Sequence, residues 1–180
     1  MATPLVSGTF ALLRQMYPDY TTEELENFMI AVTDKSASRK EVSAPALSFE
    51  HISEYYIKEP QAADYAIAGC DSAVTVNLSA DSEYDGYKAA VYNSADELVT
   101  SEFALADQDR AVTFSGLTND EIYRVKVWGY KEIKGTKFLS PCTHETEVTP
   151  TAGMASKTIE IPAAAVEEDR PVIFDLLRLW

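Results

Sequence analysis

The sequence predicts a mainly β protein in which an antiparallel β-sandwich follows a pair of α-helices. Apolar residues recur with the period of an α-helix over residues 1–36, and from residue 46 onward they alternate with polar residues at a period of two. Clusters of turn-forming residues at 80–86, 93–96 and 106–110 separate the alternating segments, as short strands joined by tight connections require.

The first predicted helix is apolar around almost its whole circumference. Pro4 suits the first position of a helix, where its missing N–H costs no hydrogen bond, and Thr3 before it can act as the cap. The apolar residues that follow are Leu5, Val6, Phe10, Ala11, Leu12, Leu13 and Met16. We therefore expect this helix to be buried on all sides.

A second helix is predicted after the turn at residues 17–20. Thr21 and Glu24 have the spacing of a capping box, and Leu25, Phe28, Met29 and Val32 then form a single apolar stripe. This helix should lie on a surface. Because two such helices cannot hide all of their apolar surface in each other, we expect them to be separated from a larger core that this chain does not contain.

The chain is predicted to have four parts. Residues 1–36 hold the helices, and residues 37–45, which are small and polar, form a linker. Residues 46–150 form a seven-stranded sandwich, with apolar strand positions at Val74, Val76 and Leu78, at Tyr87, Ala89 and Val91, at Val112 and Phe114, and at Tyr123, Val125 and Val127. Residues 151–180 are a C-terminal extension, with strands expected at 158–161 and 171–176, and are either a further strand pair or the start of another β module.

The charge of the chain excludes some classes of partner. Its formal net charge is −14 at pH 7, so a nucleic acid or an anionic membrane would repel most of its surface. The acidic residues are dispersed among apolar ones, which is typical of a solvated protein surface.

The cysteines and histidines predict neither a metal site nor a disulfide. Cys70 and Cys142 form no CxxC pair, and only His51 and His144 are available to complete a zinc site, so we expect no metal or other cofactor and two free thiols. The apolar N-terminal stretch lacks a basic region and is not expected to be a signal peptide. No apolar run is long enough to predict a membrane span.

The helical segment resembles a known enzyme family. Met1-Ala2-Thr3-Pro4, followed by Val6, Gly8 and Ala11-Leu12-Leu13, is similar to the block that follows the catalytic serine in subtilisin-like serine proteases (subtilases), where a Gly-Thr-Ser triplet leads into a buried helix. The proline-containing turn and the capped second helix match the family as well. The resemblance covers residues 1–36.

This resemblance implies how the first residues would act. Met1, Ala2, Thr3 and Pro4 would stand next to the active site, with Met1 beside the nucleophile and Thr3 and Pro4 shaping the first helical turn. Unpaired backbone N–H groups and the positive end of the helix dipole would then face the developing oxyanion. The serine, histidine and aspartate of the family's triad would all come from upstream, so the chain contains no catalytic residue and should be inactive alone.

A second resemblance covers residues 43–150. Leu117 and then Tyr123-Arg124-Val125-Lys126-Val127 are similar to the tyrosine corner and sixth strand of fibronectin type III domains, and Ser140-Pro141 and residues 147–150 resemble the last strand. The resemblance implies an immunoglobulin-like sandwich in which the Tyr123 hydroxyl bonds to upstream backbone. The family's core tryptophan is replaced by Leu78.

Three further features have a functional and an ordinary interpretation. Trp128 should point outward from its strand, either as part of a binding patch or packed under a loop or against a neighbouring domain. Residues 81–86 contain oxygen ligands and a glycine, but their spacing fits a solvated turn better than a calcium loop. Ser79, His51 and Asp81 have no spacing that would bring them together as a triad.

The sequence therefore predicts the C-terminal part of a subtilisin-like endopeptidase with an accessory sandwich. Its implied partners are the missing N-terminal part of the catalytic domain and a protein or peptide substrate, and its implied location is outside the cell or at its surface. Two alternatives stay open. One is a non-catalytic extracellular binding or adhesion module whose helices pack on the sandwich, and the other is a complete small intracellular interaction protein.

Overall fold

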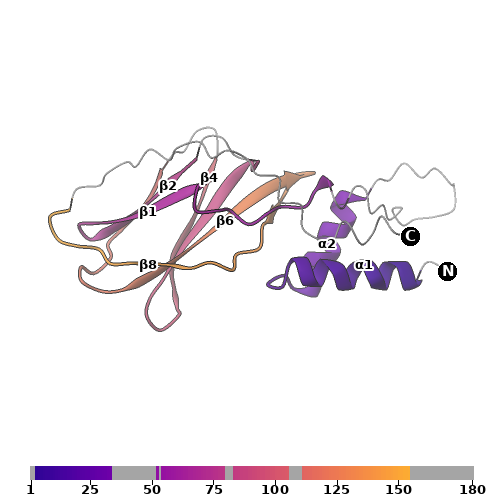
Figure 1. Ribbon diagram of the computed structural model, residues 1–180, viewed down its shortest axis with the longest axis horizontal. Coiled ribbons are helices and arrows are strands. Elements are labelled where there is room, and N and C mark those ends of the chain that lie inside the picture. Colours follow the sequence, from indigo (N-terminus) through magenta and orange to yellow (C-terminus); the bar gives the residue numbers. More distant parts are fainter. Residues whose placement is uncertain (1–2, 34–51, 53, 80–82, 106–110, 155–180) are drawn as a thin grey trace.

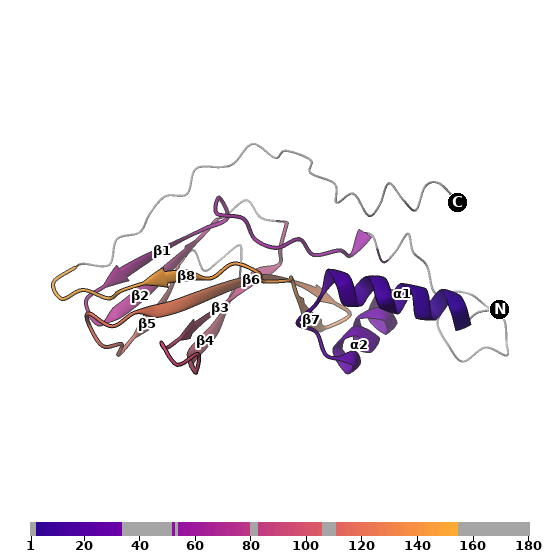
Figure 2. The ribbon, with the colours of Figure 1, turned by 60° about the horizontal axis from the view of Figure 1, so that its bottom comes forward.

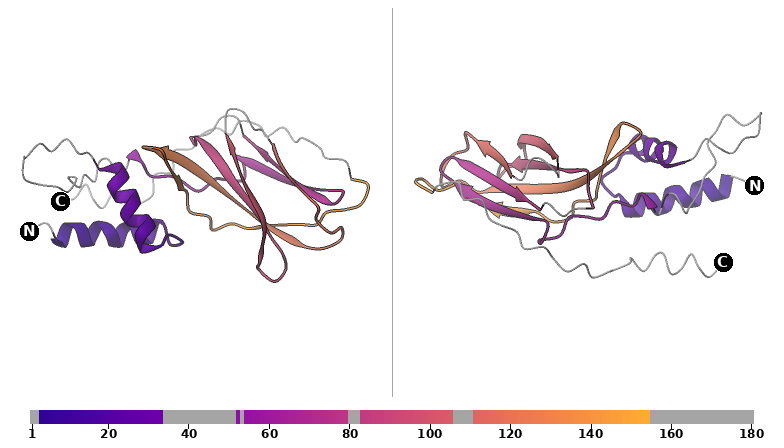
Figure 3. Two further views of the ribbon diagram at one scale, coloured as in Figure 1. Left: turned by 180° about the vertical axis from the view of Figure 1, so that it is seen from behind. Right: turned by 90° about the horizontal axis from the view of Figure 1, so that it is seen from above.

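A computed structural model of the 180-residue chain describes residues 3–33, 52, 54–79, 83–105 and 111–154. The predicted linker at 37–45 and the strands predicted at 158–161 and 171–176 lie outside these residues. In Figure 1 the molecule is elongated, with two helices at one end of a β-sandwich. Figure 3 shows from behind and from above that the helices lie beyond the end of the sheets and not over either face.

Two helices form where the sequence predicts them. Helix α1 spans Thr3–Met16 and α2 spans Thr22–Val32. The capping box of α2 is present: the Thr21 hydroxyl accepts a hydrogen bond from Glu24 N at 3.2 Å, and Thr21 N donates to a Glu24 carboxylate oxygen at 2.7 Å. The hydrogen bond donated by Thr21 N holds the pKa of Glu24 below its usual value.

The strands form two antiparallel sheets. β1 (Tyr65–Cys70), β2 (Ala73–Leu78) and β5 (Ala111–Ser115) lie in the order β1-β2-β5. The larger sheet has the order β4-β3-β6-β7 and is made of β4 (Leu98–Leu105), β3 (Gly86–Tyr92), β6 (Tyr123–Ile133) and β7 (Thr136–Leu139), with β8 (Thr146–Val148) paired to the start of β6. The prediction of a mainly β, antiparallel sandwich is confirmed.

The structure describes eight strands where the sequence predicted seven, because the last strand is divided. β7 pairs with the end of β6 and β8 with its start, and Ser140 and Pro141 lie between them. Pro141 has no N–H to donate to a ladder. Ser140 continues the contact, since its N–H donates to Gly129 O at 2.7 Å and its hydroxyl accepts from Gly129 N at 3.1 Å.

The core lies between the two sheets and continues toward the helices. Val74 and Val76 of β2 face Val91 and Val125 of the larger sheet within one apolar cluster, and all four are almost completely buried. The period of two in β2 does not separate buried from exposed side chains, because its polar residues are buried too. One of these is Thr75, whose hydroxyl shares a 3.1 Å hydrogen bond with that of Thr113.

A tight hairpin joins β6 to β7. Lys134 and Gly135 both have positive φ angles, of 52° and 82°, and Ile133 pairs with Thr136 across them. This is the geometry of a two-residue type I′ turn, in which glycine is favoured because it adopts positive φ without strain. The hairpin extends β7 toward the two helices, as Figure 2 shows.

Candidate functional site at the junction of the helices and the sandwich

Of the four residues predicted to stand beside a catalytic serine, two are described. Thr3 and Pro4 begin the helix, and Met1 and Ala2 lie outside the described residues. The first turn of α1 carries no acidic side chain, so no carboxylate of that turn neutralises the positive end of the helix dipole.

Helix α1 is buried on one side only, so the prediction of burial on all sides is wrong for this chain. Thr9 and Leu13 are buried, whereas Val6 keeps 42% of its surface exposed. Gly8 is also exposed, and a Cβ atom added to it would meet no atom within 4 Å. A side chain at this position would therefore have open space around it among the described residues of this chain.

An aromatic cluster joins the helices to the sandwich. Tyr17, which follows α1, packs against Phe28 of α2 with ring centroids 5.4 Å apart, and Phe28 meets Phe138 of β7 edge-on at 5.3 Å. Tyr17 and Phe28 are fully buried and belong to the same apolar cluster as the sandwich core. The prediction that the helices lack a core in this chain is therefore wrong in part, because α2 and the turn before it pack on the sandwich.

Hydrogen bonds fix the same junction. Ile57 N donates to the Tyr17 hydroxyl at 3.0 Å, and the Tyr20 hydroxyl donates to Leu139 O at 2.7 Å. Burial raises the pKa of both tyrosines above the ordinary value, so both hydroxyls stay protonated at physiological pH. At the end of α2, Lys134 Nζ donates to Thr33 O at 3.1 Å, which places a positive charge at the negative end of the helix dipole.

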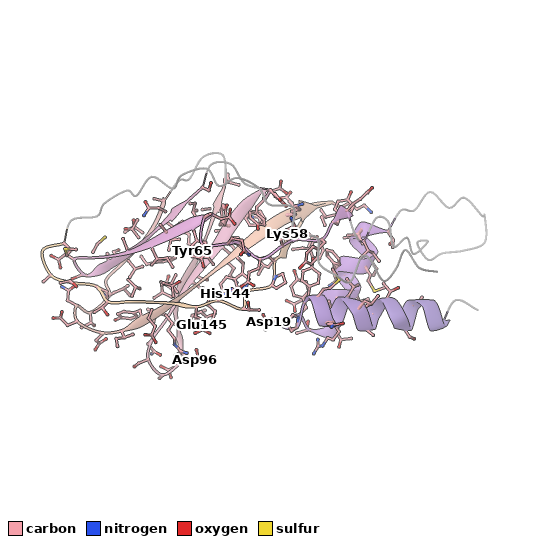
Figure 4. The ribbon with its side chains drawn as sticks, in the orientation of Figure 1. Asp19, Lys58, Tyr65, Asp96, His144 and Glu145 are labelled. Carbon is pink, nitrogen blue, oxygen red and sulfur yellow. The ribbon has the colours of Figure 1, made fainter. Side chains whose placement is uncertain are left out.

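Glu59 clamps the segment that leads into β1 onto the segment that leads into β8. Its carboxylate accepts hydrogen bonds from Thr143 N, from the Thr143 hydroxyl at 2.7 Å and from His144 N at 3.0 Å. His144 Nδ1 lies 3.1 Å from the same carboxylate (Figure 4, His144 labelled). Burial of Glu59 opposes ionisation, but the hydrogen bonds outweigh it and lower the pKa of Glu59.

The groups around this clamp do not form a nucleophilic site. Cys142 is next in sequence to Thr143, and burial raises the pKa of its thiol to about 11, so the reactive thiolate is scarce at neutral pH. The thiol donates to His144 O at 3.4 Å instead of contacting the imidazole. Cys142 and Cys70 are both free thiols, as the sequence predicted.

The other candidate sites are not assembled among the described residues. His51 and Asp81 lie outside them, and Ser79 is buried, with its N–H donated to Asp64 O. In the turn considered for calcium, the Asp85 carboxylate accepts a hydrogen bond from Glu132 N at 2.7 Å. The described part of the chain contains no group of three or more residues that could hold a metal ion, and it contains no helix long and apolar enough to cross a membrane.

Leu117 and Tyr123 lie together at the start of β6. The Tyr123 ring is buried, and its hydroxyl accepts a hydrogen bond from Thr118 N at 3.0 Å. Leu117 is buried as well, and its N–H donates to Ser72 O at 3.0 Å. The Leu117 bond joins the connection before β6 to the turn between β1 and β2, and the Tyr123 bond lies within that connection.

Aromatic and basic side chains gather on the outer face of the larger sheet. Lys88 Nζ lies 5.3 Å from the Trp128 ring centroid and 5.7 Å from that of Phe103. Lys137 Nζ lies 4.7 Å from the centroids of both Phe103 and Tyr130. Trp128 points outward, as its strand position predicted, and its ring is covered by Lys88.

Sequence reasoning missed the Glu59 clamp and the aromatic junction. Glu59 is 84 residues from Thr143 and Tyr20 is 119 residues from Leu139, and no local pattern marks such pairs. The one available signal was the pair of tyrosines in the turn at 17–20, which we interpreted as a helix-ending turn and as part of the subtilase resemblance.

Comparisons with known proteins gave matches among solved structures. No family model and no curated protein matches the chain. Among solved structures, one described as a myokine structure is 13% identical, with 52% of this chain and 98% of that chain covered and a TM-score of 0.40. The FN1–FN3 domains of chicken CNTN1 are 13% identical, with 49% of this chain and 29% of that chain covered and a TM-score of 0.40. The FN5 domain of Drosophila Lar is 16% identical, with 54% of this chain and 99% of that chain covered and a TM-score of 0.38.

The strand order decides the fold. A β1-β2-β5 sheet faces a sheet in which β3 lies between β4 and β6, and the divided last strand pairs with β6. The sandwich is fibronectin type III-like. This arrangement fixes the fold of the described β residues, and function has to be argued from particular sites on it.

Proposed function

We propose that this chain is the C-terminal part of a subtilisin-like serine endopeptidase, with the fibronectin type III-like sandwich as an accessory domain. The observation that carries the proposal is the incomplete burial of α1. Its sequence resembles the helix that follows the catalytic serine in that family, yet it leaves Val6 and Gly8 uncovered. A helix that is apolar on all sides but covered on one side is suited to a larger core.

In the parent enzyme, α1 would support acyl transfer from its N-terminal end. The serine would precede Met1, and the unpaired N–H groups of the first turn would point toward the oxyanion that develops on the substrate carbonyl. The absence of an acidic side chain from that turn favours this role, because a carboxylate there would oppose a second negative charge. The histidine and aspartate of the triad would come from farther upstream.

The sandwich would act as a spacer, a stabiliser or a selector of protein and peptide substrates, outside the cell or at its surface. The aromatic junction supports a fixed position for it, because Phe28 and Phe138 pack within a common core. A fixed accessory domain beside an active site restricts which substrates can approach, whereas a domain on a flexible tether does not.

The proposal is tested by extending the chain. We expect an in-frame Gly-Thr-Ser codon triplet directly before the Met1 codon, and we expect the extended protein to react with a fluorophosphonate probe while the 180-residue chain does not. In the extended protein, Val6→Asp should abolish labelling, because Val6 would be buried. The matched control is Ile122→Asp, at a residue of the sandwich that is 54% exposed. Labelling of the 180-residue chain, or an extended Val6→Asp variant that reacts normally, would overturn the proposal.

A second candidate function is a non-catalytic binding or adhesion module in which the helices belong to the sandwich. Two hydrogen bonds favour this second function: the Tyr17 hydroxyl accepts one from Ile57 N, and the Tyr20 hydroxyl donates one to Leu139 O. They attach the turn between the helices to the β part of this same chain. An unrelated reading frame upstream of Met1, together with a chain that is stable and inert to the probe, would favour this function over the first.

A further inference from the structure

The outer face of the smaller sheet is buried, although it points away from the core. Asn77 and Thr75 of β2 are 1% and 2% exposed, and Cys70 at the end of β1 is 3% exposed. Asn77 and Thr75 alternate along β2 with Val74 and Val76 of the core cluster, so they point to the opposite face. The Cys70 sulfur lies 3.7 Å from the Thr75 hydroxyl oxygen and is on the same face. Three side chains on the outside of a sheet are thus shielded from water.

The neighbouring side chains of this face are too small to shield them. In the register of the sheet, Ala66 and Ala68 of β1 lie beside Asn77 and Thr75, and Thr113 of β5, on the other side, is itself exposed. The two helices lie beyond the end of the sheets, and every other described strand belongs to the larger sheet (Figure 3). No helix or strand of the described part of the chain therefore covers this face.

The side-chain amide of Asn77 calls for a polar partner on the same face. Its oxygen and its nitrogen are both buried, and neither has a hydrogen-bond partner among the described residues. A buried amide that is left unpaired is costly, and such groups are rare in folded proteins. The Asn77 amide offers an acceptor and a donor side by side, and the N–H and C=O groups of an extended peptide backbone match this pair.

The described chain ends beside this face. After β8, residues 151–154 turn at the end of the β1–β2 hairpin, as Figure 2 shows, and Gly153 has a φ angle of 78°. Thr151 N donates a hydrogen bond to Cys70 O at 3.2 Å, and Asp71 N donates one to Met154 O at 2.9 Å. The chain therefore leaves the described part at the Cys70 end of the outer face.

We propose that residues 155–162 of this chain pack along the outer face of the smaller sheet and that their backbone hydrogen-bonds to the Asn77 amide. A segment of this length spans about 26 Å when extended, whereas β2, with six residues, spans about 20 Å. The segment is therefore long enough to reach Asn77 from Met154. This inference does not depend on the proposed protease function.

The composition of both partners suits this contact. Ile159 and Ile161 alternate with Thr158 and Glu160, so an extended segment presents one apolar side and one polar side. The alanines of β1 accept the apolar side and let the backbone of the segment come close to the sheet. This contact would also give the strand predicted at residues 158–161 a place in the fold.

The reactivity of Cys70 shows whether the segment covers this face. In the full chain, Ile159→Asp/Ile161→Asp should speed iodoacetamide labelling of Cys70 at least about tenfold, because carboxylates do not pack against alanines and the segment should detach. The matched control, Val172→Asp/Ile173→Asp, adds the same charge later in the chain and should leave the rate unchanged. Mass spectrometry reads Cys70 and Cys142 separately, and Cys142 should label equally in all variants. Circular dichroism shows whether each variant is folded.

Equal labelling of Cys70 in the two double variants would overturn the proposal and leave this face to another part of the chain. Protection of Cys70 that disappears on dilution would overturn it as well, because the cover would then be a second copy.

Hydrogen exchange tests the role assigned to Asn77. Asn77→Leu keeps a side chain of similar size but removes the amide, so the backbone amides of residues 155–161 should exchange at least about tenfold faster than in the unaltered chain. The control is Asn27→Leu, the same change at an exposed position of α2, which should have no effect on these amides. Exchange of these amides at the rate of an unfolded peptide in the unaltered chain would overturn the proposal. Exchange that Asn77→Leu does not alter would overturn the assigned hydrogen bond.

Discussion

Phe28 of α2 meets Phe138 of β7 edge-on, with ring centroids 5.3 Å apart and ring planes at 76°. Both rings are buried, and they come from parts of the chain separated by nearly the whole sandwich. The contact makes the second helix a structural part of the β domain. The first helix lies outward of this contact, with one side uncovered.

Phe28→Ala should release the helices from the sandwich. Removing a buried phenylalanine ring costs about 3–5 kcal/mol, and the loss falls on the junction. We expect trypsin to cleave after Arg14 much faster in the variant, while the fragment that contains β1 to β8 stays intact on a gel. Ile30→Ala is the control, because Ile30 is 48% exposed, and it should leave the cleavage rate unchanged. Rapid cleavage of the unaltered chain after Arg14 would contradict the docked arrangement.

The two tyrosine hydroxyls of the junction should differ in their effect on stability. Tyr17→Phe leaves Ile57 N buried without its acceptor, which should lower the free energy of unfolding by about 1–3 kcal/mol. Tyr20→Phe removes a bond to the part-buried Leu139 O and should lower it by about 1 kcal/mol. Urea unfolding of the two variants measures both values. A larger loss for Tyr20→Phe would reverse our ranking of the two bonds.

The Glu59 clamp should make stability depend on pH. The folded pKa of Glu59 is lowered from 4.5, so its contribution is fully present above pH 4.5 and is lost as the pH falls through the folded pKa. Glu59→Gln should therefore lower the stability by about 1–3 kcal/mol at pH 7, and this loss should shrink as the pH falls below 4.5 and through the folded pKa of Glu59. Melting temperatures across this range test it. Glu147→Gln, at an exposed position of β8, serves as the control, and a Glu59→Gln effect that is independent of pH would exclude the ionised clamp.

Cys142 should react slowly with alkylating reagents. With a thiol pKa of about 11, its thiolate fraction at pH 8 is about a hundredfold below that of a thiol with an ordinary pKa of 9.0. The rate of iodoacetamide labelling, followed by mass spectrometry, should keep rising up to about pH 11. A plateau below pH 9 would show that the thiol is more accessible to water than the structure has it.

Two glycines should respond to alanine in opposite directions. A Cβ at Gly129 would clash with the Tyr84 ring, so Gly129→Ala should cost about 1–3 kcal/mol. A Cβ at Gly8 would meet nothing, and alanine is the better helix former, so Gly8→Ala should stabilise α1 by about 0.5–1 kcal/mol. Chemical denaturation measures both. Destabilisation by Gly8→Ala would mean that Gly8 has a close neighbour in this chain.

The sequence predicted the local features well. The capping box of Thr21 and Glu24 depends on residues three apart, so its spacing was visible in the sequence, and the period of two located β2, β3, β5 and the first part of β6. The division of the last strand was not predicted, although Pro141 was its available signal.

The packing of distant elements could not be predicted in the same way. The apolar stripe of α2 showed that Phe28 would be buried, but it did not show that Phe138 would cover it. The edge position of β4 was hidden for a similar reason, since the order of strands in a sheet is set by pairing between remote segments.

The hydrogen bond from Lys134 to Thr33 has a consequence for the order of assembly. Its two residues are 101 positions apart, so the charge that caps the end of α2 becomes available only after the β6–β7 hairpin has closed. A ribosome makes the helical segment first. The side of α2 that packs on Phe138 therefore gains this partner only after nearly all of the described sandwich has been synthesised.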